Sequence, residues 1–522
     1  MDLFLKILML LLFFAIMVGV GLSCRRHSRS VDGFVLGGRS VGAWFTAFAY
    51  GTSYFSAVIL VGYSGQFGWK YGIASTWIGI GNAVIGSYLA WIVLGRRTRI
   101  MTQHLGSRTM PDFFAKRYGS ESLKTGAALI IFLFLIPYAA SLYNGLSRLF
   151  AMAFGINYTV CIVGMTVLTA AYVVAGGYMA TVINDFIQGI IMLFGIVAIV
   201  AASLKQFGGL SEAMVSLARV SDSSVSEAPG IFTSFFGPDP FNLLCVVILT
   251  SLGTWSLPQM TQKFYAIKNE SAIHKGTVIS TLFALVVAGG CYFLGGFGRL
   301  LSSRVDVAAQ GYDAIIPTMF ETFSPLLIGL VVILVLSASM STLSSLVLTA
   351  SSTLTLDFIQ PKFCARMKDS RQISVIRVLI LIFVTLSAIL AIVQYQYKFA
   401  FIAQLMGLSW GAMAGAFLGP YLYGLYWKRT SAAAVWVSYI FGVGVMLLNM
   451  FFPAAFPTFL RSSINCGVFA MLGSLVLTPL VSLLTKKPGE AHLERVFACY
   501  GKTVTVTVRD SIGDEAGEPA KP

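Results

Sequence analysis

The chain consists of long apolar stretches separated by short polar loops. A window of about 18 or more apolar residues is long enough to cross the hydrocarbon core of a bilayer as a helix. Windows of this kind lie near residues 3–23, 42–65, 72–94, 125–153, 158–177, 180–204, 239–258, 275–298, 324–350, 372–394, 399–427, 430–452 and 462–484. The pattern therefore predicts an all-α polytopic membrane protein with about 13 transmembrane helices.

Spans two to six and spans seven to eleven can be laid out as two sets of five helices. An odd number of helices in a set means that the second set enters the membrane upside down, which is a transporter architecture. The first helix of each set is then interrupted near the midplane, where the binding sites lie. The expected interruptions are Tyr50–Ala57 and Ser251–Gln259, both with glycine and hydroxyl residues, and Pro258 removes a backbone donor from the second.

This layout divides the chain into six parts, none of them an independent soluble domain. They are a first transmembrane helix with its inner loop (1–41), the first five-helix repeat (42–204), an external loop (205–238), the second, inverted repeat (239–427), two C-terminal helices (428–485) and a cytoplasmic tail (486–522). A fused signalling domain is therefore not expected, and a sensor function would need a partner chain.

Composition and charge agree with a membrane protein. Hydrophobic residues make up 57% of the 522 residues and charged residues only 11%, while the net charge is +15. With the N-terminus outside and the C-terminus in the cytoplasm, about 27 of the 36 Lys and Arg residues fall on the inner side and about 8 outside. We therefore expect a multi-pass protein of the plasma (inner) membrane in contact with lipid. Basic residues spread over short loops do not indicate nucleic-acid binding.

Two features place polar chemistry inside the predicted membrane region. Asp185 lies in span six about nine residues from its inner end, and a carboxylate at that depth usually faces a cavity, a partner or an ion. Eleven of the nineteen residues from 337 to 355 carry hydroxyls. Ala338, Ser341, Thr342 and Ser345 share one helical stripe, which can offer oxygens to a small cation together with carbonyls freed at a helix break. Close helix packing is the competing interpretation of such hydroxyls.

Several stretches resemble the sodium:solute symporter family, whose members include bacterial proline, pantothenate, sialic acid and sugar symporters. They are FVLGGRSVG before span two, GGYMATVINDFIQG in span six, SLPQMTQKFYAIKNESAIHKG after span seven and SASMSTLSSLVLTASSTLTLDF in span nine. The resemblance covers residues 30–485. It implies a leucine-transporter-like fold with a five-plus-five inverted repeat and Na⁺ as the coupling ion.

The resemblance also implies sodium ligands. A first sodium would be held by the backbone at Thr52, Phe55 and Ala338 and by the hydroxyls of Ser341 and Thr342. Some family members bind a second sodium, and the matching positions of this chain are Asp185, Ser341, Ser344 and Ser345. Both one and two sodium ions per cycle remain open at this point.

The substrate positions point away from proline. Proline transporters carry an acidic residue at the first break, where this chain has Tyr54, and aromatic residues where it has Thr250 and Thr254. The sequence around SLPQMTQKFYAIKNESAIHKG and the pair Asn184 and Asp185 resembles the pantothenate-type branch more closely. We therefore expect an organic acid or amino-acid-like solute, with a sugar as a further option. Candidate solute contacts lie near the midplane at Ser56, Tyr143, Thr254, Trp255 and Gln404.

These observations predict a sodium-coupled symporter that takes up a small organic solute by alternating access. Two alternatives stay open: a proton-coupled amino-acid permease of the same fold, with Asp185 as proton carrier, and a transporter-like sensor. An enzyme is not expected, because the sequence shows no paired catalytic acids, metal-ligand cluster or nucleophile constellation. The oligomeric state and the identity of the solute do not follow from the sequence.

Overall fold

The protein is a bundle of α-helices in a computed structural model, which describes residues 2–24, 30–226, 228–397 and 402–501. Its long and short helices are α1 (Asp2–Ser23), α2 (Val31–Leu36), α3 (Ala43–Tyr54), α4 (Ser64–Tyr71), α5 (Thr76–Gly81), α6 (Arg96–His104), α7 (Met110–Tyr118), α8 (Glu121–Phe154), α9 (Tyr158–Gln206), α10 (Leu210–Ala218), α11 (Pro240–Leu252), α12 (Pro258–Ala266), α13 (Glu270–Gly295), α14 (Val307–Gln310), α15 (Ile315–Phe320), α16 (Pro325–Thr353), α17 (Gln360–Phe363), α18 (Asp369–Tyr397), α19 (Ile402–Tyr426), α20 (Ala432–Phe451), α21 (Ser463–Leu484) and α22 (Glu490–Phe497). Short 3₁₀ and π turns join several of them.

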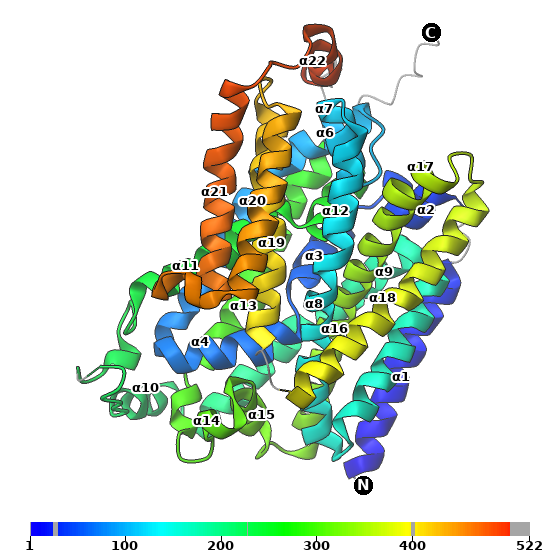
Figure 1. Ribbon diagram of the computed structural model, residues 1–522. Helices are drawn as coiled ribbons and strands as arrows, with labels where there is room; N and C mark the ends of the chain where they lie inside the picture. The colour runs from blue at the N-terminus through cyan, green and yellow to red at the C-terminus, as the bar shows by residue number, and fades with distance from the viewer. Residues whose placement is uncertain (1, 25–29, 227, 398–401, 502–522) are drawn as a thin grey trace, which may run out of the picture.

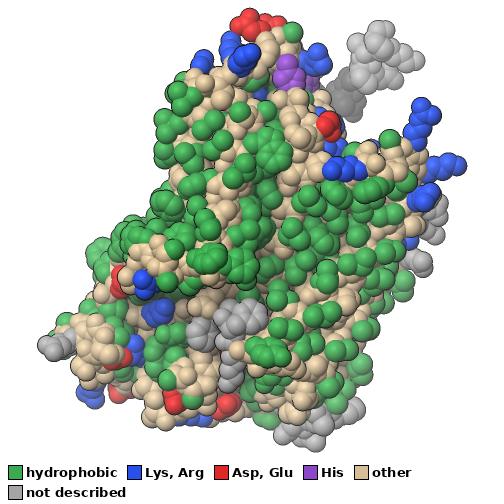
Figure 2. Space-filling view, viewed as in Figure 1, with side chains coloured by type: hydrophobic (Ala, Val, Ile, Leu, Met, Phe, Trp, Pro, Cys, Tyr) green, Lys and Arg blue, Asp and Glu red, His purple; other side chains and the backbone are tan. Residues whose placement is uncertain are grey.

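Apolar helices form the body of the molecule, and polar elements lie at its two ends. Figure 1 shows α10, α14 and α15 at the end where the N-terminus lies, and α22 at the opposite end. Figure 2 shows hydrophobic side chains covering the middle of the visible face, while most charged side chains gather at the two ends. This distribution is the one that a bilayer selects, because a lipid-facing surface carries apolar side chains.

Among the described residues, nine single helices and one bent pair are long and apolar enough to cross a membrane. The difference from the predicted number has a physical cause, because several predicted spans are short or broken helices. The span expected at 158–177 ends at Gly177, whose φ of 59° and ψ of −157° interrupt α9 before the next span begins. The number of spans and the six-part division therefore remain predictions.

Both expected helix interruptions are confirmed. Helix α3 ends at Tyr54, Phe55 adopts an extended conformation (φ −94°, ψ 114°), and helical structure resumes after Ser56. Helix α11 passes into a 3₁₀ turn and ends before Leu257 (ψ 125°), and α12 then starts with Pro258. The two segments of the second broken helix are bent by 47°. Each break frees backbone carbonyls in the interior of the bundle.

The segment before α3 is hydrogen-bonded to the segment after α12. The Val41 N–H, just before α3, donates to the Ala266 carbonyl at 3.3 Å, and the Lys268 N–H donates to the Val41 carbonyl at 2.9 Å. These bonds form an isolated parallel bridge between Val41 and Ile267. The start of α3 and the end of α12 are thus held together at one end of the molecule.

Helix α4 crosses α13 with almost no space between the two backbones. A Cβ atom added to Gly68 would lie 1.9 Å from the Gly295 carbonyl oxygen, and one added to Gly295 would lie 2.1 Å from the Ser64 oxygen. Only glycine permits this approach. The crossing fixes the segment that follows the first break against the second repeat.

Candidate functional site

The candidate sodium site lies where the broken helix α3 meets the hydroxyl-bearing face of α16. The Thr342 Oγ1 atom is 3.0 Å from the Thr52 carbonyl oxygen, 3.3 Å from that of Phe55 and 3.1 Å from that of Ala338. The Ser341 Oγ atom lies 3.2 Å from the Thr52 oxygen and 3.1 Å from the Ala338 oxygen. The structure therefore brings together all five positions expected for the first sodium.

The local backbone explains why these oxygens are available. In a continuous helix the Thr52 carbonyl would accept the amide of Ser56, but the extended Phe55 directs the chain away from that bond. The last amide bond of α3 is donated by Phe55 to the Gly51 carbonyl. Carbonyls at a helix end without an intrahelical partner are ready acceptors for a cation.

The donor set suits a cation of the size of Na⁺. Ions of this size hold oxygens at about 2.3–2.6 Å, so oxygens at right angles around one ion are about 3.3–3.7 Å apart. The observed separations of 3.0–3.3 Å require only a small expansion. Three carbonyls and two hydroxyls also supply five acceptor oxygens but only two protons, and all the residues concerned are buried. The cluster is therefore rich in acceptors and fits a cation.

Two of the residues expected to bind a second sodium contact a lysine side chain. The Lys263 Nζ atom of α12 lies 3.6 Å from Asp185 Oδ2 and 3.1 Å from Ser345 Oγ. The Ser344 hydroxyl donates to the carbonyl of Ser341 on its own helix, at 3.0 Å. Asp185 and Ser345 thus share an ammonium group, a contact that the sequence analysis did not anticipate.

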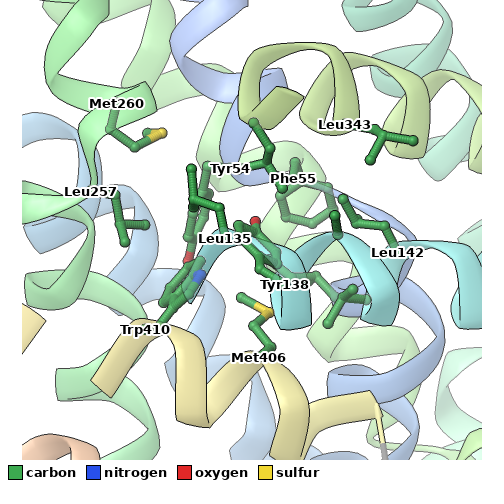
Figure 3. Packing of buried hydrophobic residues seen from close by; sticks show 14 of the residues in the cluster. Tyr54, Phe55, Leu135, Tyr138, Leu142, Leu257, Met260, Leu343, Met406 and Trp410 are labelled. Atoms are coloured by element: carbon green, nitrogen blue, oxygen red, sulfur yellow. The ribbon is translucent and has the colours of Figure 1, made fainter. Parts of the chain in front are cut away.

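A second polar cluster without charged side chains lies beside the first break. Within the described part of the chain, Ser56 Oγ, the Tyr138 hydroxyl and Trp410 Nε1 are buried and form no hydrogen bond to any group outside this cluster, while the Tyr138 hydroxyl faces the other two atoms. The Trp410 ring centroid is 5.8 Å from those of Tyr54 and Tyr138, and Ser56 lies next to Tyr138. Figure 3 shows these rings side by side between α8 and α19, with Met406 close by. Unpartnered polar atoms between aromatic walls suit a small amphipathic solute.

The other predicted solute contacts lie elsewhere or have protein partners. The Thr254 hydroxyl is 2.7 Å from the Ser251 carbonyl, and the Trp255 indole donates to the Ile85 carbonyl at 2.9 Å. Tyr143 is buried on α8 and directs its hydroxyl toward threonines of α9. Gln404 lines a separate cavity of about 990 Å³ near α4 and α11. Only Ser56 of the five predicted residues joins the central cluster.

Sequence reasoning missed Tyr138, Trp410 and Lys263. An aromatic residue inside an apolar span gives no periodic signal, since rings are common in the cores of helical bundles. Lys263 stands near the end of a predicted span, where a basic residue normally reaches the interface. The available signal for Lys263 was its place in α12, directly after the predicted break.

Comparisons with known proteins identify the family of the chain. The model of the sodium:solute symporter family matches residues 34–442. An osmoregulated proline transporter (OpuE) of Bacillus subtilis is 26% identical over 94% of this chain and 97% of its own length. Sodium/proline symporter 2 of Staphylococcus saprophyticus is 28% identical over 92% of this chain and 93% of its own. These relatives do not support the expectation of a sequence closer to the pantothenate-type branch.

Two solved structures share the fold. The substrate-bound outward-open state of a Na⁺-coupled sialic acid symporter superposes with a TM-score of 0.73 at 19% identity, covering 93% of this chain and 98% of that one. An inward-facing conformation of Mhp1 gives a TM-score of 0.51 at 15% identity, covering 87% and 94%. The predicted leucine-transporter-like fold is therefore confirmed, and the chain belongs to the sodium:solute symporter family, whose members are multi-pass membrane transporters and not enzymes.

Proposed function

We propose that this sodium-coupled symporter takes up a small zwitterionic amino acid, with proline as the first candidate, and binds the coupling sodium between α3 and α16. The observation that carries the proposal is the convergence of five oxygens from Thr52, Phe55, Ala338, Ser341 and Thr342. Sodium there would tie the broken helix to its neighbour. Loss of the ion would release that tie, which is the change that alternating access requires.

The proposed solute site adjoins the sodium site. Ser56 follows Phe55 directly, so one helix break supplies a sodium ligand and an unpartnered hydroxyl. Tyr54, Tyr138 and Trp410 provide aromatic walls for an apolar ring, and the free hydroxyl and indole groups can bind a carboxylate. The names of the relatives in Bacillus and Staphylococcus support proline, against the expectation drawn from Tyr54, Thr250 and Thr254. Sodium ordering the break would then also order the solute site.

The proposed orientation places the N-terminus outside the cell and the C-terminus in the cytoplasm. The distribution of Lys and Arg along the sequence supports it. In this orientation α10, α14 and α15 lie outside and α22 lies inside (Figure 1). The cavity lined by Gln404, Lys70 and Arg299 then opens toward the exterior, on the side from which solute enters.

Uptake into proteoliposomes tests the proposal. The purified chain is reconstituted alone, and radiolabelled proline uptake is measured with an inward sodium gradient and with potassium replacing sodium at fixed pH. We expect concentrative uptake only with sodium. Uptake that persists unchanged in potassium would favour the proton as coupling ion. Sodium-dependent proline binding without any counterflow would instead identify a sensor.

A further inference from the structure

A buried lysine and a buried aspartate form a pair in the middle of the bundle, next to the candidate sodium site. The Lys263 side chain is 1% exposed and that of Asp185 is 0% exposed. Besides Asp185 and Ser345, the Lys263 ammonium faces the ring of Tyr178, with Nζ 5.3 Å from the ring centroid. A buried lysine without an opposite charge is strongly disfavoured, so its place beside a buried carboxylate is specific.

Four segments of both repeats meet around this ammonium. Lys263 comes from α12, Asp185 and Tyr178 from α9, and Ser345 from α16. The Ser345 hydroxyl also lies 2.9 Å from the Ser53 hydroxyl on α3. Ser345 is one helical turn beyond Ser341, which places the ammonium cluster about 6 Å along α16 from the candidate sodium site.

The ammonium leaves little opportunity for a second sodium at the same oxygens. A sodium ion bound to Ser345 Oγ at about 2.4 Å would lie within about 5.5 Å of Lys263 Nζ, because Nζ is itself 3.1 Å from that oxygen. The Asp185 carboxylate lies only 3.6 Å from Nζ, so its attraction for an added cation is largely offset by the repulsion from the ammonium. The oxygens of Asp185 and Ser345 therefore lack the net negative charge that would hold a second sodium ion.

We propose that the Lys263 ammonium is a built-in cation that takes the place of a second sodium ion, so that this symporter binds one sodium per chain. The inference rests on the proposed function, because it presupposes a sodium at Thr52, Ser341 and Thr342. A second sodium would enter and leave in every cycle, whereas the lysine stays attached to α12. The uptake of each solute molecule is therefore driven by the entry of one sodium ion and not of two.

The test counts sodium sites on the purified full-length protein with ²²Na⁺, without any need for a solute. Wild type is expected to saturate at one sodium per chain. Lys263→Met keeps an unbranched apolar side chain but leaves Asp185 unpaired, and it is expected to saturate at two. The double variant Asp185→Asn/Lys263→Met removes both charges and is expected to return to one. Lys268→Met is the matched control, since Lys268 is exposed five residues further on, and it should bind one sodium.

The outcomes separate this inference from the proposed function. Wild type that binds two sodium ions overturns the inference, as does folded Lys263→Met that stays at one. Wild type that binds none refutes the sodium site itself. If Lys263→Met does not fold, Lys263→Gln takes its place, because glutamine also removes the charge but keeps a polar group beside Asp185. Lys263→Gln is expected to saturate at two sodium ions, and folded Lys263→Gln that stays at one overturns the inference. Sodium should also raise the melting temperature of Lys263→Met more than that of the double variant.

Discussion

The candidate sodium site can be tested most directly by replacing Thr342 with alanine. The Thr342 hydroxyl is the only side-chain oxygen of the five that lies near all three carbonyls, those of Thr52, Phe55 and Ala338. Its removal leaves four ligands and takes away the oxygen that joins α16 to both sides of the break. Sodium affinity should therefore fall while the fold is retained.

The size of the effect follows from the kind of contact that is lost. A polar contact to a charged group contributes about 1.5–3 kcal/mol, which corresponds to about a 10- to 150-fold weaker affinity. Without sodium, the Thr342 hydroxyl makes only an ordinary hydrogen bond, at 3.0 Å from the Thr52 oxygen, whose loss costs about 0.5–1.5 kcal/mol of stability. The sodium dependence should therefore change much more than the stability of the sodium-free protein.

The assay is proline uptake into proteoliposomes as a function of external sodium, with ²²Na⁺ binding as a second measurement. Thr342→Ser retains the hydroxyl and should stay close to wild type. Thr355→Ala is the matched control, because Thr355 is buried further along the same chain segment and its hydroxyl bonds back to the Ser351 carbonyl at 2.8 Å. It should leave the sodium dependence unchanged.

The reasoning is refuted if Thr342→Ala reaches half-maximal uptake at the sodium concentration of wild type. A shift shared equally by Thr342→Ala and Thr355→Ala would also refute it, since general loosening of the helix and not a lost ligand would then be the cause.

Two further predictions concern the solute site and the helix crossing. Tyr138→Phe removes a buried hydroxyl of the proposed solute site and should raise the proline concentration for half-maximal uptake by about 3- to 10-fold without changing ²²Na⁺ binding; an unaltered proline dependence would remove Tyr138 from the site. Gly68→Ala places a Cβ 1.9 Å from the Gly295 oxygen and should lower stability by about 1–3 kcal/mol or more, measured as a lower melting temperature. Gly42→Ala, where a Cβ has nothing within 4 Å, should melt like wild type, and equal melting of both glycine variants would contradict the close crossing.

The fold could be predicted from the sequence because membrane helices leave local signals, and the candidate sodium site left such signals only in part. Apolar windows reveal membrane helices, and a hydroxyl stripe on one helix together with a glycine-containing break on another marks a cation site. The five ligand positions Thr52, Phe55, Ala338, Ser341 and Thr342 were implied by the resemblance to the family. The structure brings these residues together, and sodium binding by them stays a prediction.

The contacts of Asp185 could not be predicted in the same way. Asp185 and Lys263 are 78 positions apart, and no pattern within a single helix shows that α9 and α12 face each other. The central rings of Tyr138 and Trp410 were missed for a related reason, since many aromatic residues of a bundle are equally apolar and only the packing decides which of them leave a polar atom unpaired.

The bridge between Val41 and Ile267 has a mechanical consequence. It joins the residue that precedes α3 to the residue that follows α12. The half-helix before the first break and the half-helix after the second break are therefore connected through their backbones. If α3 tilts when it separates from α16, these backbone hydrogen bonds would make α12 tilt with it. Opening toward the α22 end of the molecule would then move α3 and α12 together, with the breaks at Phe55 and Leu257 as hinges.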